Sequence, residues 1–183
     1  MLVDNLTNFY SNNYFDLFGL PVKFDLDQKL LAMRCYELQQ QFHPDHCINN
    51  KSAIEKKICL ERCAFINKAW QILRQPLSRA VYILSIYGFD IIGNESSITD
   101  LSFLNEQLQL REECEKIEQQ LNEVTLNNFI NKINTLVSTL TVQIEKQMEY
   151  QKWEEAVKTV QKLQFLTKLR HHLDELENRL FNF

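Results

Sequence analysis

The sequence contains little glycine and proline, only three residues of each in 183. Tight turns between strands usually need these two residues, so a protein built from many hairpins is excluded. No segment alternates apolar and polar residues among β-branched neighbours, which is the pattern of a half-buried strand. With 45% hydrophobic and 24% charged residues, the composition is that of a folded globular protein. We therefore predict an all-α fold.

Long apolar runs are also missing, since none approaches the roughly 20 residues of a membrane helix. The N-terminus has neither the cationic and apolar regions of a secretory signal nor the arginines of a transit peptide. The formal net charge is −4 and the pI about 5.6, which argues against general nucleic-acid binding. We expect a bacterial cytoplasmic protein, rather than one of the mitochondrial matrix, without membrane or nucleic-acid partners.

Catalytic motifs are absent as well. There is no glycine-rich phosphate loop, nucleophile elbow or pair of catalytic carboxylates, so we expect neither an enzyme nor a bound cofactor. The five cysteines, at positions 35, 47, 59, 63 and 114, include no Cys-x-x-Cys pair. In a chain with no secretory signal they are expected to be free thiols that mainly fill space in the core.

The tripeptide His43-Pro44-Asp45 lies between two amphipathic stretches. Before it, apolar residues recur at steps of four, three and four, which indicates one face of a helix: Leu31, Cys35, Leu38 and Phe42. Pro44 cannot continue that helix, which should begin at its N-cap Asp27 and end near Phe42. Ser52 to Glu55 reads as a capping box for the next helix, to about Leu73. The tripeptide is therefore predicted at the tip of a turn between two helices.

The charge distribution indicates two domains, because residues 1–90 carry 10 basic and 9 acidic side chains and residues 91–183 carry 10 and 15. After a flexible lead-in at 1–13, the first domain is expected at 14–87. It should begin with a short helix at 14–18 and end with a helix that starts at Pro76. Residues 88–100, which contain two of the three glycines, are predicted to be a linker.

Residues 101–183 contain neither glycine nor proline and read as three helices: about 101–123, from near 125, and from near 152. The apolar residues of the first are Leu101, Leu104, Leu108 and Ile117. Such seams could form an intermolecular coiled coil. The two breaks between the helices favour an intrachain three-helix bundle and a monomer.

The sequence resembles a J-domain in the order of its elements, which is a helix, His-Pro-Asp and a second helix. The resemblance continues in Ile66–Leu73 and in Pro76, Arg79, Ala80 and Tyr82. Further blocks are similar to the HscB family, whose co-chaperones act in iron–sulfur cluster biogenesis. They are Tyr14-Phe15 with Leu17–Pro21, Phe103–Leu108 with Leu110–Glu113, and Lys162–Leu166. The resemblance covers about residues 14–183. It implies a J-domain, which is an antiparallel helical hairpin with short flanking helices, joined to a C-terminal three-helix bundle.

The resemblance also implies two protein partners. The J-domain would dock on an ATP-loaded chaperone of the HscA/DnaK type and stimulate ATP hydrolysis, through His43, Pro44 and Asp45 with Arg34 and Lys29. The bundle would hold the cluster scaffold protein IscU, through Leu104, Leu108, Glu112 and Phe165. Pro44 would limit the entropy lost on docking, and the Asp45 carboxylate could pair with an arginine of the chaperone.

The chain departs from the family pattern in both regions. Gln40 and His46 stand where basic residues are frequent, so chaperone docking should be weaker and less salt-sensitive than in a more basic relative. In the bundle, Asn105 replaces a frequent apolar residue, Gln109 a glutamate, and Lys116 an acidic residue.

The bundle residues leave one question open. Spacing alone does not decide whether Leu104 and Leu108 belong to the bundle core or to a partner contact. Phe165 lies off the seam of Leu163 and Leu166, which favours an exposed anchor.

Three other functions remain open from the residues. The chain could be a J-domain adaptor that brings a different client to a general chaperone. His43, His46 and Cys47 could form part of a zinc site, but no fourth ligand is evident, and His171-His172 are expected on the surface of the last helix. A purely structural helical protein would be insensitive to His43→Gln in every chaperone assay.

Overall fold

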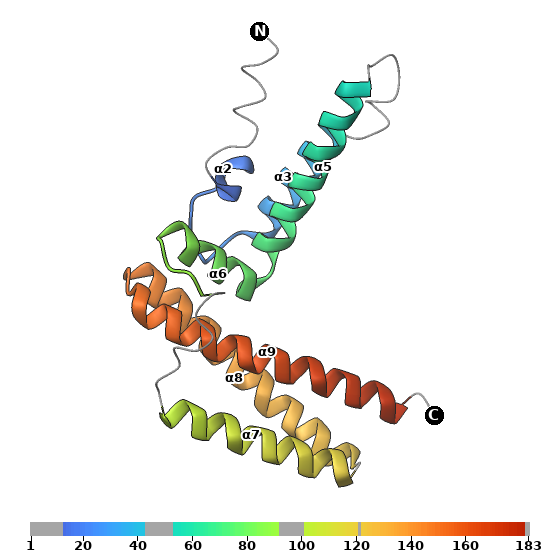
Figure 1. Ribbon diagram of the computed structural model, residues 1–183, viewed down its shortest axis with the longest axis vertical. Helices are drawn as coiled ribbons and strands as arrows, with labels where there is room; N and C mark the ends of the chain where they lie inside the picture. Colours follow the sequence, from blue (N-terminus) through green and yellow to red (C-terminus); the bar gives the residue numbers. More distant parts are fainter. Residues whose placement is uncertain (1–12, 43–52, 92–100, 121, 182–183) are drawn as a thin grey trace. The chain divides into compact units, whose positions relative to one another are not determined.

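The computed structural model describes residues 13–42, 53–91, 101–120 and 122–181. Within these ranges the secondary structure consists of helices without a strand, which confirms the all-α prediction (Figure 1). The helices are α2 (Tyr14–Leu17), α3 (Gln28–Gln41), α5 (Ala53–Arg74), α6 (Pro76–Ile86), α7 (Leu101–Gln120), α8 (Glu123–Glu149) and α9 (Trp153–Phe181). None of these described helices is long and apolar enough to cross a bilayer.

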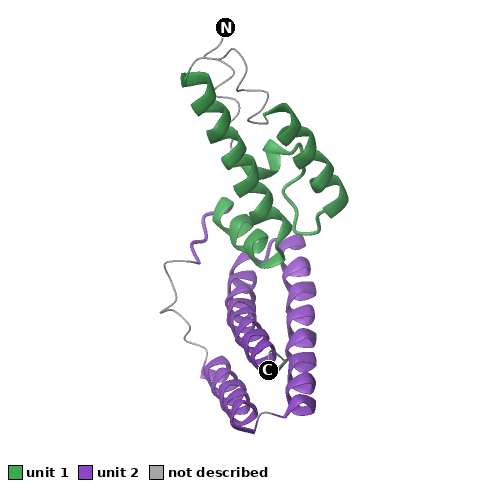
Figure 2. Cartoon of the chain, turned by 90° about the vertical axis from the view of Figure 1, so that its right-hand side faces the viewer, with its two compact units in different colours: residues 1–86 green, residues 87–183 purple. Residues whose placement is uncertain are grey.

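The chain divides into two compact units, residues 1–86 and 87–183 (Figure 2). Unit 1 contains α2 to α6, and unit 2 contains α7 to α9. Most of the expected lead-in and most of the expected linker, residues 1–12 and 92–100, lie outside the described residues.

Unit 1 is built on the helical hairpin of α3 and α5 (Figure 1). The carboxylate of Asp27 caps α3 by accepting hydrogen bonds from the backbone N–H groups of Lys29 and Leu30, at 2.9 and 3.1 Å. The aromatic residues of α2 pack on α5 and α6, where the Tyr14 ring stacks on Tyr82 at 4.4 Å between centroids. The backbone N–H of Tyr14 also donates to the Tyr82 hydroxyl. These contacts fix the short helix to the hairpin.

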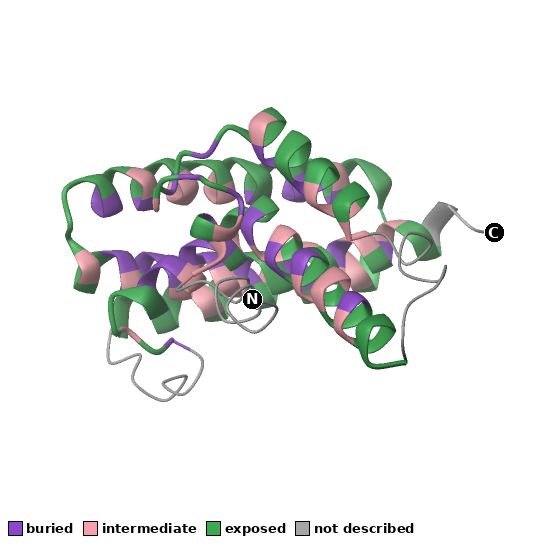
Figure 3. Ribbon diagram, turned by 90° about the horizontal axis from the view of Figure 1, so that it is seen from above, coloured by how far each residue is buried: buried purple, intermediate pink, exposed green. Residues whose placement is uncertain are grey.

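Unit 2 is a three-helix bundle whose longest helices, α8 and α9, form an antiparallel hairpin (Figure 1). Asn122 caps α8, and Gln151, at φ 57°, makes the left-handed turn into α9. All three helices contribute to one core: Leu110, Cys114, Leu126, Phe129, Ile130, Ile133, Leu166, Leu169, Leu173 and Leu176. Figure 3 shows the resulting alternation of buried and exposed positions along the helices.

The apolar face of α7 differs from the one that its leucines indicate. Phe103, Leu110 and Cys114 are the buried residues of this helix. By contrast, Leu101 is 75% exposed, Leu104 39% and Leu108 57%. Only one stripe of a helix can face its neighbours, and the larger Phe103 ring defines it here by packing with its edge on Phe165 of α9.

The cysteine prediction is correct in part. Cys35, Cys63 and Cys114 are free thiols, and Cys35 and Cys114 are buried core residues. Cys59 instead takes part in a disulfide bond, so the expectation of a free thiol is wrong at this position. Disulfide pairing depends on which cysteines the fold brings together, and the sequence spacing does not report this. Cys47 lies outside the described residues.

Candidate partner-binding surfaces

The tripeptide His43-Pro44-Asp45 lies outside the described residues, but its two flanking helices are defined. α3 ends at Gln41 with Phe42 as its C-cap, and α5 begins at Ala53. Since α3 and α5 pack against each other, their ends hold both sides of the segment that carries the tripeptide.

The two basic residues expected on the chaperone-binding helix do not form one face. Lys29 and Arg34 are five positions apart, which places them about 140° apart around α3. Both are exposed, but the Arg34 guanidinium is paired with Glu37 at 3.2 Å. Much of the positive charge of Arg34 is therefore offset on its own helix.

The outward face of α3 carries residues that the sequence analysis did not identify. Met33 and Tyr36 lie one and two turns beyond Lys29 and are 48% and 61% exposed. The Tyr36 hydroxyl accepts a hydrogen bond from the Gln40 amide at 2.7 Å. The spacing of Lys29, Met33, Tyr36 and Gln40 at steps of four, three and four, opposite the buried Leu31 and Cys35, could have revealed this face.

The structure places Leu104 and Leu108 outside the bundle core. Neither contributes to the bundle core, and both lie with the exposed Leu101 and Glu112 on the outward face of α7. We call these four residues the leucine stripe. Its three leucines are exposed, and none of them belongs to the core cluster.

Phe165 is half-buried, and so less exposed than the sequence indicates. Its ring packs against the bundle core and meets Phe103 edge-on at 6.2 Å between centroids. The Arg111 guanidinium lies over the same ring, 5.7 Å from its centroid. Arg111 is on α7, one turn beyond Leu108, so Phe165 and the leucine stripe belong to neighbouring parts of the α7–α9 surface.

A groove of about 250 Å³ lies beside Phe165 between α7 and α9. Its lining residues are Arg111, Cys114, Glu115, Glu118, Phe165, Lys168, Leu169 and His172. Burial raises the pKa of the Cys114 thiol, and the charges of Glu118 and Glu115 raise it further. The thiol is therefore held in its neutral form, which is neither nucleophilic nor a good metal ligand.

The two C-terminal histidines lie on α9 as expected. His171 is exposed, and His172 lies 3.7 Å from the Glu118 carboxylate. Within the described ranges, no group of three His, Cys, Asp or Glu side chains could hold a metal ion. The zinc candidate formed by His43, His46 and Cys47 lies outside those ranges.

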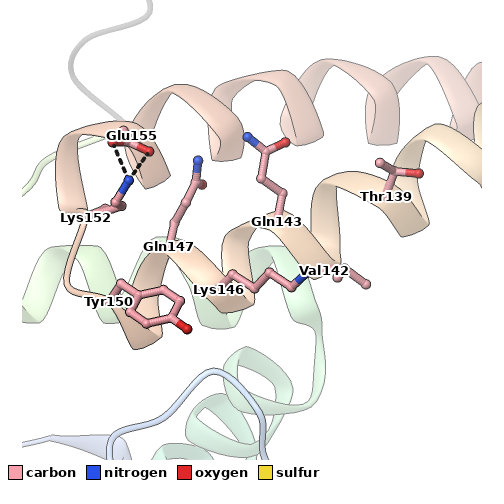
Figure 4. A pocket seen from close by; sticks show the side chains of 8 residues that line it. All are labelled: Thr139, Val142, Gln143, Lys146, Gln147, Tyr150, Lys152 and Glu155. Carbon is pink, nitrogen blue, oxygen red and sulfur yellow. Dashed lines mark hydrogen bonds and ion pairs between the residues drawn. The ribbon is translucent and has the colours of Figure 1, made fainter.

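A second cavity, of about 420 Å³, lies at the turn between α8 and α9 (Figure 4). It is lined by Gln147 and Tyr150 among others, and beside it Lys152 pairs with Glu155. The buried Gln147 carbonyl oxygen has no protein partner among the described residues. A polar cavity of this kind is ordinarily filled by water, and none of the predicted site residues lines it.

Comparison with known proteins identifies the family. The structure matches that of the chaperone HscB from Vibrio cholerae with a TM-score of 0.81 and 35% sequence identity, over 92% of this chain and 99% of that one. The chain belongs to the HscB family. It is therefore a co-chaperone of this family, as the resemblance implied.

Other comparisons agree with this assignment. A model of the HSCB C-terminal oligomerisation domain matches residues 99–174, which include α7, α8 and most of α9. The fold is shared with the human co-chaperone HscB, at 23% identity over 92% of this chain and 83% of that one and a TM-score of 0.85. It is also shared with the yeast co-chaperone Jac1, at 19% identity over 91% and 94% and a TM-score of 0.73. In this HscB-family chain, the leucine stripe lies within the matched C-terminal region.

Proposed function

We propose that this chain is the J-type co-chaperone of an iron–sulfur cluster assembly system. Unit 1 docks on an ATP-loaded HscA/DnaK-type chaperone through the His43-Pro44-Asp45 segment and α3, and stimulates ATP hydrolysis. Unit 2 binds an IscU-type scaffold protein through the leucine stripe and Phe165 and delivers it to that chaperone. Membership of the HscB family supports both halves of this proposal.

The leucine stripe is the observation that carries the proposal. Leu104 and Leu108 point away from a core that Phe103, Leu110 and Cys114 already fill. Neighbouring exposed leucines on one helix face indicate a partner surface, since burial of each leucine side chain contributes about 1.5–3 kcal/mol. Glu112 continues the stripe as a polar rim, and Phe165 supplies an aromatic ring beside it, the combination typical of an interface hot spot.

The chaperone half of the mechanism depends on pre-organisation. The packed helices α3 and α5 hold both ends of the segment that carries the tripeptide, which limits the entropy lost on docking. Within it, Pro44 restricts the backbone, while the Asp45 carboxylate is suited to a charge-assisted hydrogen bond from a chaperone arginine. On α3, the exposed Met33 and Tyr36 add apolar contact next to Lys29. We therefore expect docking of this chain to depend less on charge than docking through a more basic helix does.

The scaffold contact is tested with the double variant Leu104→Ala/Phe165→Ala in the full chain. We expect binding of a purified IscU-type scaffold to weaken at least about tenfold, because two hot-spot side chains are truncated. The matched control is Val124→Ala/Val142→Ala, which truncates two α8 side chains that are 67% and 50% exposed. Titration calorimetry measures the affinities, and circular dichroism checks that both variants stay helical. Unchanged affinity in the first variant contradicts the proposed surface.

A second assay separates this function from the adaptor alternative. Single-turnover ATPase of an HscA-type and of a general DnaK-type chaperone is measured with this protein, with and without the scaffold. The proposal predicts that the scaffold increases stimulation of the HscA-type chaperone. Stimulation of DnaK alone, with no capture of the scaffold, supports an adaptor for another client.

A further inference from the structure

The groove between α7 and α9 continues the leucine stripe on one side. At about 100° per residue, Arg111 and Glu118 lie on the α9 side of the stripe, while Glu115 is in line with Leu104 and Leu108; all three line the groove. Asn105, Gln109 and Lys116 lie on the opposite side of the stripe, towards α8. On that α8 side Glu113 pairs with Lys132 at 2.7 Å. The two sides of the stripe therefore differ in charge and in shape.

The Arg111 guanidinium is the cationic group best placed to meet a partner in this region. It is exposed and lies over the Phe165 ring, and among the described residues it has no ion-pair partner. The nearby carboxylate of Glu118 is already occupied, because His172 and Arg179 lie 3.7 and 3.8 Å from it. Stacking on the ring holds the guanidinium plane in place without using its hydrogen-bond donors.

We propose that Arg111 receives a carboxylate of the scaffold protein that binds the leucine stripe. The partner segment then carries an aliphatic side chain for Leu104 and Leu108, and an aspartate or glutamate about one helical turn further along, next to the α7–α9 groove. This inference rests on the proposed function and specifies the chemistry of the partner at the same surface. It makes Arg111 a specificity-determining residue.

Three physical arguments support a carboxylate as the occupant. Arg111 follows Leu108 by three positions on α7, so one short segment can reach both side chains. A planar guanidinium binds a carboxylate through two parallel hydrogen bonds. Because the ring of Phe165 already orients this guanidinium, little side-chain entropy is lost when the pair forms.

The test compares Arg111→Gln, Arg111→Lys and the control Lys146→Gln, which removes the same charge from the exposed face of α8. Binding of a purified IscU-type scaffold to the full chain is measured by calorimetry at low and high salt. We expect Arg111→Gln to weaken binding about tenfold at low salt and to reduce the salt dependence. Arg111→Lys should lose part of the affinity, since lysine keeps the charge but not the planar pair. Lys146→Gln should bind as wild type does.

The outcomes separate this inference from the proposed function. If Leu104→Ala/Phe165→Ala loses scaffold binding while Arg111→Gln keeps the wild-type affinity and salt dependence, the carboxylate pairing is wrong and the surface stands. An equal loss in Lys146→Gln also overturns the inference, because the effect is then one of net charge. If the wild-type chain binds no scaffold, the proposed function itself fails.

Discussion

A single buried arginine fixes the turn between α5 and α6. Arg79 is 6% exposed, and its Nη1 donates a hydrogen bond to the Leu73 carbonyl at 2.6 Å. That carbonyl belongs to the last turn of α5, where no helical N–H is available to it. The guanidinium also lies over the Phe24 ring, 5.0 Å from its centroid. Burial lowers the pKa of Arg79, and the charge of Asp25 opposes this shift.

Arg79→Met should therefore destabilise unit 1. The substitution keeps most of the apolar volume but leaves the Leu73 carbonyl buried without a donor, at a cost of about 1–3 kcal/mol. Urea unfolding followed through Trp70 fluorescence in a Trp153→Phe background measures the change. The control is Arg74→Met, because Arg74 is exposed and stacks on Trp70 at 4.5 Å, a contact worth about 0.5–1 kcal/mol. Equal unfolding midpoints for the two variants contradict the structural role of Arg79.

The candidate site shows how far the role of a single residue can be predicted from the sequence. The residue types at 104, 108 and 165 indicated a candidate partner surface through their resemblance to a family, but they did not indicate how exposed each side chain is. Spacing could not decide between core and surface for Leu104 and Leu108, because α7 has apolar residues on two faces and only packing against α8 and α9 selects one. The sequence did not predict a role for Arg111 for a related reason. The position of its guanidinium depends on contact with the ring of Phe165, which belongs to another helix.

At the scale of elements, the helices themselves were predictable. α3 was expected from Asp27 to about Phe42 and is observed at Gln28–Gln41, and α5 was expected to about Leu73 and ends at Arg74. Local signals mark these ends: the Asp27 cap, and Pro76 in the first turn of α6. α8 begins at Glu123, two residues before the expected Thr125, because the Asn122 side chain caps it. α7 also ends earlier than expected, at Gln120.

The charge on α3 leads to a prediction about chaperone docking. Lys29, Arg34 and Glu37 are the charged residues of this helix, and Glu37 offsets Arg34 by direct pairing. Glu37→Gln frees the Arg34 guanidinium and raises the charge of the helix by one unit. We expect ATPase stimulation at limiting co-chaperone to increase about two- to fivefold at low salt, and its salt dependence to become steeper.

Single-turnover ATPase across a salt series measures this effect. Glu61→Gln is the matched control, since Glu61 is an exposed partner of Lys57 on α5 and its loss changes the net charge equally. A response in Glu61→Gln as large as in Glu37→Gln would assign the effect to the overall charge of unit 1, and not to α3.

At the scale of the whole molecule, the two proposed contacts lie on different units. The tripeptide segment and α3 belong to unit 1, and the leucine stripe with Phe165 belongs to unit 2. Each unit has its own buried core, centred on residues such as Ile66 and Leu84 in one and Ile133 and Leu173 in the other. A change at one contact should therefore leave the other contact intact.

This independence predicts that His43→Gln turns the protein into a competitor. The variant should bind the IscU-type scaffold with wild-type affinity through unit 2 while it fails to stimulate the chaperone through unit 1. Added in excess to wild-type protein and limiting scaffold, it should suppress the scaffold-dependent part of the single-turnover ATPase in proportion to its share of the scaffold. The physical reason is mass action, because each scaffold molecule held by the variant is withheld from a co-chaperone that can dock.

The same variant carrying Leu104→Ala/Phe165→Ala should not suppress the reaction, since it no longer holds the scaffold. If both forms inhibit equally, the variant acts by occupying the chaperone, and the two contacts are not separable in the way that the two units imply.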